Sequence, residues 1–265
     1  MLRVGAAIVI VAAFAALVGP FLAPFDPAAQ DLALRLAAPT AAHPLGLDEL
    51  GRDMLARVLA GARISFLVGL TVVSVSASVG TLLGAMAGYF GGVLDDVISR
   101  VIDVLLAFPG LLLAIALVAV LGPSLANVLF ALTVIGWVGY ARLVRGQVLR
   151  AREFEFVQAA RALGARTPRI LWQHIVPSAI PAVVVQGTLG MAGAIIGEAA
   201  LSFLGLGVQP PTPSWGTMLN GGRAHLLDAP HLTIFPGLAI ALLVLGFNFL
   251  GDGLRDATDP KTVKT

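Results

Sequence analysis

The chain has 265 residues, of which 58% are hydrophobic and 12% are charged, and its mean hydropathy is +0.92. Soluble domains carry roughly 25% charged residues, so this composition excludes a soluble enzyme, a disordered tail and a nucleic-acid-binding module. The chain contains no cysteine, which excludes a disulfide framework, a thiol nucleophile and a cysteine-ligated metal. The composition predicts a single polytopic α-helical membrane protein.

Six stretches of the sequence are apolar and about as long as a membrane-crossing helix, which needs roughly 20 residues. They cover residues 5–22, 64–90, 104–121, 124–140, 180–207 and 232–251. We therefore expect an all-α membrane protein with six transmembrane helices. The first stretch could pass for a signal peptide, but no small-residue cleavage motif ends it, so we expect a retained helix. Pro109, between Phe108 and Gly110, is expected to bend the start of the third helix.

The basic residues predict the orientation of these helices. Seven of the 17 lysines and arginines lie between Arg142 and Arg169. With both termini in the cytoplasm, 12 basic residues, Lys261 and Lys264 among them, fall inside and 5 fall outside, as the positive-inside rule requires. Residues 23–62 then lie outside the cell. Their mixed charges are expected either to form a solvated amphipathic helix or to contact an extracytoplasmic protein.

Small residues recur at helical spacing in two of the predicted helices. Gly80, Gly84 and Gly88 follow one another every four positions, and so do Gly193 and Gly197. Such stripes let helix backbones approach closely in lipid. They predict either packing within this chain or an interface shared with a second membrane subunit.

The loop of residues 141–178 is too polar to cross a membrane, but its sequence is patterned. Residues 153–163 are expected to form a helix with Phe156, Val157, Ala160 and Leu163 on one face. Gly164 suits the left-handed position that ends a helix.

A second short helix is expected to follow, with Thr167 as its N-cap, Pro168 at its first position and an end by Pro177. Two short helices that meet at a glycine form an elbow, and its apolar side chains need a surface that buries them. The pattern alone leaves two readings open, an interfacial helix on anionic lipid or a docking surface for a soluble partner.

The spacing within this loop resembles the EAA loop of bacterial ABC importer permeases. That motif runs Glu-Ala-Ala, three residues, Gly, nine residues and Ile-x-Leu-Pro. Gln158 here replaces its glutamate, and His174 and Val176 replace its isoleucine and leucine. The loop is similar to the variant of peptide importers, in which Ala-Ala-Arg-x-x-Gly-Ala precedes His-x-x-Pro. The resemblance implies that these residues couple the chain to an ATPase: Gln158, Ala159, Ala160, Arg161, Gly164, Ala165, His174 and Pro177.

Two further stretches extend the resemblance over most of the chain. Residues 43–53, running on to 61–65, and residues 198–207, followed by 210–216, resemble the C-type permease of dipeptide, oligopeptide and nickel importers. The family implies a type I ABC importer permease fold in a bacterial or archaeal inner membrane. Residues 1–63 would form the first span and an extracytoplasmic amphipathic segment, and residues 64–265 the permease core.

The same resemblance implies partners and a substrate class. A second permease subunit, in a heterodimer, would complete the pathway, and two ATPase subunits and an extracytoplasmic substrate-binding protein would be separate chains. Dipeptides and oligopeptides are the expected substrates, with nickel complexes and glutathione as alternatives.

The chain's own chemistry is consistent with a non-catalytic subunit. Lys261 and Lys264 are its only lysines and no glycine-rich loop precedes either, so it lacks a standard phosphate-binding loop, and ATP and Mg²⁺ would bind to partner subunits. Its four histidines lack metal-ligand spacing, and no predicted span contains a histidine that could activate Ser202. We therefore expect no enzymatic activity, cofactor or metal site in this chain.

Glu198 is the one acidic residue inside a predicted span, and such a group is a functional candidate. It could bind a substrate cation or relay protons, which would make the chain an ion-coupled secondary transporter. Alternatively, it is a hydrogen-bonded carboxyl at a helix interface, the reading that we favour.

Trp215, after a proline-rich turn, is expected to be an interfacial aromatic anchor.

Overall fold

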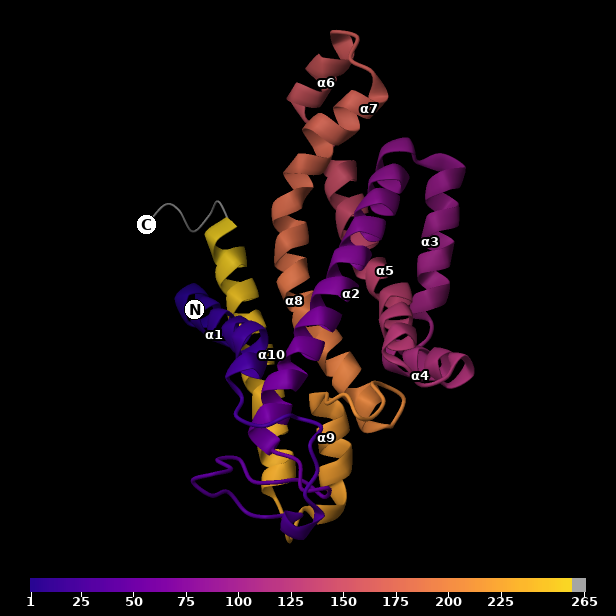
Figure 1. Ribbon diagram of the computed structural model, residues 1–265. Helices are drawn as coiled ribbons and strands as arrows, with labels where there is room; N and C mark the ends of the chain where they lie inside the picture. The colour runs from indigo at the N-terminus through magenta and orange to yellow at the C-terminus, as the bar shows by residue number, and fades with distance from the viewer. Residues whose placement is uncertain (259–265) are drawn as a thin grey trace.

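The computed structural model describes residues 1–258 and forms an elongated bundle of helices (Figure 1). Lys261 and Lys264, counted above among the inner charges, lie outside the described residues. Five helices are long and apolar enough to cross a membrane. They are α1 (Leu2–Leu22), α2 (Met54–Phe90), α5 (Leu125–Ala151), α8 (Val176–Phe203) and α10 (His231–Thr258).

These helices match five of the six predicted spans and extend beyond the apolar stretches, except that α8 ends at Phe203, before position 207. α2 begins ten residues before position 64 because Asp53 caps it, with its Oδ1 accepting a hydrogen bond of 2.8 Å from the amide of Ala56. α5 continues past position 140 to Ala151. Hydropathy therefore locates the apolar part of each span but underestimates the length of helices such as α2 and α5. Polar turns at their ends form the same backbone hydrogen bonds as the apolar part.

The third predicted span, residues 104–121, is bent at Pro109 as the sequence predicted, and it starts later than the helix that the chain forms there. It covers the end of α3 (Gly92–Leu106) and all of α4 (Gly110–Leu121), which meet at a bend of 86° and together can count as a sixth span. Pro109 lies in the break and is the N-cap of α4. Because proline lacks an amide hydrogen and excludes the helical conformation at the preceding residue, the chain turns here instead of continuing.

The stripe of glycines on α2 packs against α5 of the same chain. A Cβ atom at Gly80 would lie 2.6 Å from the carbonyl oxygen of Trp137, and one at Gly88 would lie 2.8 Å from that of Arg145. A Cβ at Gly84 would overlap the carbonyl oxygen of Ala141. This stripe therefore serves packing within the chain, the first of the two alternatives. The α8 stripe is divided: a Cβ at Gly197 would lie 2.9 Å from Leu132 of α5, whereas nothing lies within 4 Å of a Cβ at Gly193.

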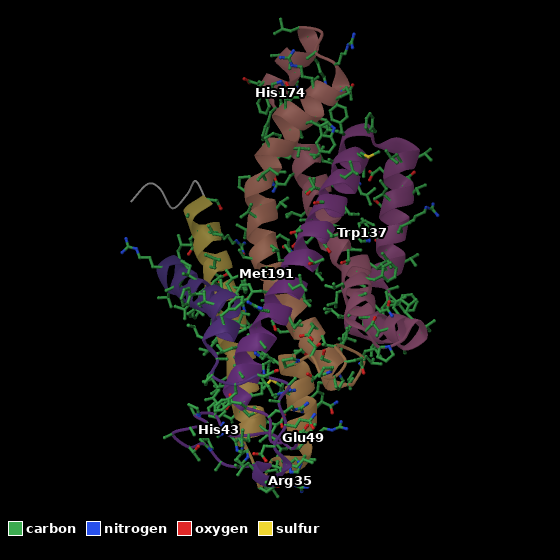
Figure 2. The ribbon with its side chains drawn as sticks, in the orientation of Figure 1. Arg35, His43, Glu49, Trp137, His174 and Met191 are labelled. Carbon is green, nitrogen blue, oxygen red and sulfur yellow. The ribbon has the colours of Figure 1, made fainter. Side chains whose placement is uncertain are left out.

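The chain's two polar ends lie at opposite ends of the bundle (Figure 1). One end carries α6 (Glu155–Ala162) and α7 (Thr167–Ile170), and Figure 2 places His174 there. The other carries the 23–53 segment and α9 (Trp215–Gly222), with the short helical turns η1 (Leu32–Leu34) and η3 (Arg223–His225). Figure 2 places Arg35, His43 and Glu49 at this second end.

Of the predicted outer segment, residues 23–62, the last nine form the start of α2, and residues 23–53 are irregular except for η1, so no separate amphipathic helix, one of the two alternatives, forms there. Its charges instead pair with one another. Asp48 Oδ2 lies 2.6 Å from Arg52 Nε and 3.3 Å from Arg57 Nε, and His43 Nδ1 lies 2.9 Å from Asp53 Oδ2. Because four of these charged side chains, those of Asp48, Arg52, Asp53 and Arg57, are buried, the segment forms a fixed cap on the bundle instead of a solvated helix.

Candidate functional site

The 141–178 loop is anchored to the bundle by apolar residues of both its helices, and Val157 and Ala160 supply the anchor from the predicted face. Val157 of α6 is fully buried and belongs to a cluster of buried residues that reaches from the loop to the ends of α2 and α5. The other members of that cluster are Ala85, Val144, Val148, Ala151, Ile170, Leu171, Ile175 and Val176. The elbow is therefore held rigidly against the membrane core.

Gly164 ends α6 in the way the sequence predicted. Its φ is +78°, in the left-handed region that glycine adopts freely. The amide of Gly164 donates to the carbonyl of Arg161 at 2.9 Å, and the amide of Ala165 donates to that of Ala160 at 3.0 Å. This is the paired hydrogen-bond pattern of a Schellman cap, and it fixes the angle of the elbow.

The second helix of the elbow differs from the prediction at both ends. α7 begins at Thr167, with Arg166 as its N-cap and no side-chain capping bond, so the assignment of Thr167 as N-cap was wrong by one residue. The helix also does not stop by Pro177. It passes through a π-helical turn, η2 (Leu171–Ile175), directly into α8. The wider turn provides room where the ring of Pro177 would otherwise crowd the carbonyl four residues earlier.

The predicted coupling residues lie mostly on the surface of this elbow. Ala160 and Ala165 are half-buried, and the others are exposed: Gln158, Ala159, Arg161, Gly164, His174 and Pro177. Four large apolar side chains are exposed beside them, namely Phe154, Phe156, Leu163 and Trp172. Two of these, Phe156 and Leu163, belong to the face expected to be buried, so nothing among residues 1–258 covers half of that face.

Arginines connect the elbow and α5 to the end of α2 and the start of α3. Arg145 donates two hydrogen bonds to Asp95, at 2.5 Å and 2.7 Å. The guanidinium of Arg161 lies 5.4 Å from the centre of the Tyr89 ring, within the range of a cation–π contact. At least these arginines have specific contacts within the chain, in addition to any role in setting topology.

Glu198 lies at a helix interface near the end of α8. Its carboxyl is fully buried and accepts a hydrogen bond of 2.6 Å from the hydroxyl of Ser202. Gly216 of α9 approaches so closely that a Cβ there would lie 2.7 Å from that of Ser202. This geometry agrees with the favoured reading, a hydrogen-bonded carboxyl where α8 and α9 meet.

Trp215 is not an interfacial anchor, because its side chain is buried. It is 3% exposed and donates from Nε1 to the carbonyl of Val58 at 2.9 Å. Gly61 leaves the room for this ring, since a Cβ there would lie 2.8 Å from Trp215 Cδ1. The contact ties α9 to α2, and its partner lies 157 positions away in sequence, too far for a local pattern to reveal.

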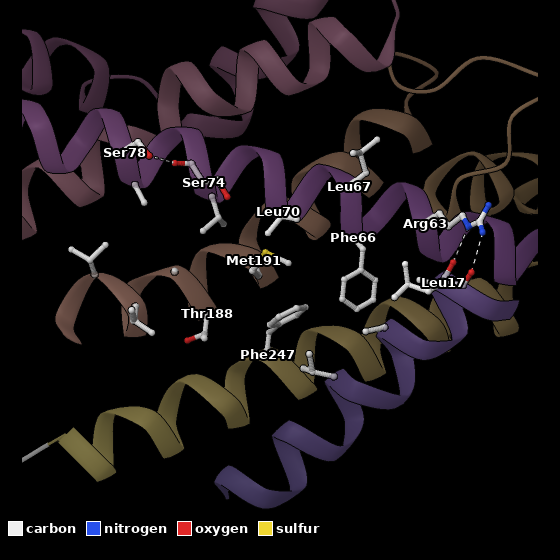
Figure 3. A pocket seen from close by; sticks show the side chains of 18 residues that line it. Leu17, Arg63, Phe66, Leu67, Leu70, Ser74, Ser78, Thr188, Met191 and Phe247 are labelled. Atoms are coloured by element: carbon white, nitrogen blue, oxygen red, sulfur yellow. Dashed lines mark hydrogen bonds between the residues drawn. The ribbon is translucent and has the colours of Figure 1, made fainter. Parts of the chain in front are cut away.

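A cleft of about 960 Å³ lies between α1, α2, α8 and α10 (Figure 3). Three of the four polar side chains that line it, those of Arg63, Ser78 and Thr188, bond to the chain's own backbone. Arg63 donates to the carbonyls of Ala16 and Leu17 at 2.9 Å and 3.0 Å, and Ser78 donates to that of Ser74 at 2.7 Å. The cleft therefore offers mainly apolar surface to whatever fills it.

A smaller crevice of about 380 Å³ lies between α2, α5, α8 and the start of α4. Its polar groups come from three helices: Ser76 on α2, Tyr140 on α5 and Gln186 on α8. Sequence reasoning missed these residues, because a single serine, tyrosine or glutamine in a span carries no signal that the three meet. Within residues 1–258, no group of three histidines or acidic residues is arranged to hold a metal ion.

Comparison with known proteins gives consistent matches. A family described as the binding-protein-dependent transport system inner membrane component matches residues 80–264, and one described as the N-terminal TM domain of oligopeptide transport permease C matches residues 1–39. The dipeptide transport system permease protein DppC of Alkalihalophilus pseudofirmus is 48% identical, over 93% of this chain and 81% of its own length.

Two further relatives and a solved structure agree with these matches. The glutathione transport system permease protein GsiD of Pectobacterium atrosepticum is 50% identical over 84% of this chain and 74% of its own. The probable D,D-dipeptide transport system permease protein DdpC of Escherichia coli is 45% identical over 91% of this chain and 81% of its own length. An inward-facing structure of the MetNI methionine ABC transporter matches with a TM-score of 0.57 and 20% identity, covering 76% of this chain and 94% of that one. This likeness confirms the predicted fold class.

Proposed function

The chain belongs to the family of binding-protein-dependent transport system inner membrane components, and on this premise we propose that it forms half of the translocation pathway of an ABC importer for short peptides. The dipeptide, D,D-dipeptide and glutathione permeases among its relatives support this substrate class, because glutathione is itself a tripeptide. These relatives favour peptides over nickel complexes as the substrate class.

The elbow of the 141–178 loop is the observation that carries the proposed coupling role. It projects from one end of the bundle, is held rigidly by Val157 and Gly164, and presents exposed apolar side chains beside the small residue Ala159. A short helix with this surface fits a groove of a soluble ATPase subunit. Closure of the ATPase pair on ATP would displace the elbow and, through it, the attached helices.

The remaining partners follow from this role. A second permease subunit completes the pathway, two ATPase subunits bind ATP and Mg²⁺, and an extracytoplasmic protein delivers the peptide, so this chain needs no catalytic group of its own. The elbow and both termini face the cytoplasm, and the 23–53 segment faces outward. Residues 1–63 form the first span and the outer segment, and residues 64–265 the core.

Cross-linking from a single introduced cysteine tests this proposal, because the natural chain contains none. We expect Ala159→Cys, in membranes that contain the co-expressed ATPase, to form a cross-link through a short bifunctional reagent. Ala159→Trp should abolish co-purification of the ATPase and peptide uptake, whereas Ala159→Ser should preserve both. Normal uptake by Ala159→Trp, or uptake that resists vanadate and collapses with a protonophore, would refute the coupling role.

A further inference from the structure

The crevice between α2, α5 and α8 is lined mostly by apolar and small residues, with three polar side chains among them. Ser76, Tyr140 and Gln186 supply its polar groups, and Gly136, Gly190 and Gly193 are among its glycines. No charged residue lines it. A pocket of this composition can hydrogen-bond a neutral polar group but selects for no particular charge.

The hydroxyl of Ser76 is a buried polar group without a partner. The residue is 1% exposed, and its Oγ has no hydrogen bond within the described chain. A buried hydroxyl left unsatisfied costs roughly 1–3 kcal/mol. A hydrogen-bonding occupant of the crevice would remove that cost.

Two glycines pack directly against buried hydroxyls of the crevice, of which that of Tyr140 also donates to the carbonyl of Gln186 at 3.4 Å. A Cβ atom at Gly136 would lie 2.5 Å from Ser76 Oγ, and one at Gly190 would lie 2.5 Å from the hydroxyl of Tyr140. Any larger residue at either position would displace the hydroxyl it meets. Gly193, which is exposed and has nothing within 4 Å of its Cβ position, leaves one side of the crevice open.

The larger cleft of Figure 3 is lined by no residue with a buried polar side-chain atom that lacks a hydrogen bond within the described chain. The polar side chains of Arg63, Ser78 and Thr188 that line it bond to backbone carbonyls of this chain. It suits an apolar occupant, such as a lipid tail or a helix. Of the two spaces, the smaller crevice is therefore the one that can recognise a polar molecule in transit.

We propose that this crevice contacts the main chain of a peptide as it crosses the membrane, with Ser76 hydrogen-bonding a peptide amide or carbonyl. The proposal rests on the proposed function and adds the chemistry of recognition. A hydroxyl both donates and accepts, and main-chain groups are common to all peptides. The crevice would therefore favour peptides as a class without distinguishing their side chains.

A matched pair of serine variants tests the role of the hydroxyl. Ser65, on the same helix, is also fully buried and has no hydrogen-bond partner in the described chain, and it is not among the residues of the crevice. In the reconstituted importer, with dialanine and glutathione as probes, we expect Ser76→Ala to raise the KM for uptake roughly twofold to tenfold. Ser65→Ala should leave it unchanged. Equal uptake kinetics of the two variants would overturn the proposal.

Labelling of introduced cysteines gives an independent readout. Gly193→Cys in the assembled importer should react with a water-soluble maleimide, and saturating dialanine should slow the reaction. Val101→Cys, on the exposed face of α3, should stay unreactive because it faces lipid. If Gly193→Cys is unreactive in every nucleotide state, a packed helix or lipid fills the crevice and the proposal fails. If the wild-type importer transports neither probe, the proposed substrate class itself is wrong.

Discussion

The contact between α2 and α5 at Gly84 predicts the effect of a single methyl group. Gly84→Ala would place a Cβ against three backbone atoms of Ala141: 3.0 Å from the carbonyl carbon and from Cα, and in overlap with the carbonyl oxygen. Backbone atoms cannot rotate away as side chains do. The two helices would have to separate along the whole stripe, which includes the close approaches at Gly80 and Gly88.

The magnitude follows from two opposing effects. Overpacking costs about 1–3 kcal/mol, and we expect the upper end because the obstructing atoms are backbone. Alanine is a better helix former than glycine by about 1 kcal/mol, which offsets part of this cost. The net destabilisation is about 2 kcal/mol, and for a chain of this size it lowers the unfolding temperature by roughly 4–8 °C.

Thermal unfolding of the purified complex in detergent measures this shift. Gly146→Ala is the matched control, because Gly146 lies on α5, is exposed and has nothing within 4 Å of its Cβ position. It should unfold at the wild-type temperature or above. If Gly84→Ala and Gly146→Ala shift the unfolding temperature equally, then α2 and α5 do not pack as closely as described.

Substitutions at Gly164, at the Arg145–Asp95 pair and at Glu198 probe the elbow and the helix ends. Gly164→Asn should keep ATPase co-purification because asparagine tolerates a positive φ, whereas Gly164→Val, strained by roughly 1–2 kcal/mol, should weaken it. Arg145→Gln should lower the unfolding temperature by the equivalent of about 1 kcal/mol, since its pair with Asp95 is partly exposed, and adding Asp95→Asn should recover part of the loss. Glu198→Gln should preserve peptide uptake, because an amide oxygen can also accept the hydrogen bond of Ser202. Lost uptake with normal assembly would instead indicate a pathway role.

The sequence predicted the features that depend on local chemistry. A run of apolar residues marks a span whatever its neighbours are, and a glycine such as Gly164 predicts a left-handed cap because only the local backbone matters. The positions of the helix ends were harder to predict. Pro177 indicated a stop, but the π-helical turn before it allows the helix to continue, and nothing in the residues themselves announces that turn.

The remaining features depend on contacts between distant segments. Trp215 looked like a surface anchor because its acceptor, the carbonyl of Val58, is remote in sequence. The charges of the 23–53 segment looked like the polar face of a helix, but they pair across turns. Ser76 and Tyr140 share a crevice only because α2 and α5 cross at their glycines, and that crossing is a property of the fold.

The continuous helix from Thr167 to Phe203 has a mechanical consequence. Its 37 residues form a helix about 55 Å long at 1.5 Å per residue, and no loop interrupts it. The elbow grips one end, and Gln186 and Gly193 of the crevice lie partway along. The π-helical turn at Leu171–Ile175 and Pro181 both lie between the elbow and the crevice, so a displacement of the elbow would bend the helix at these two points and so alter the shape of the crevice.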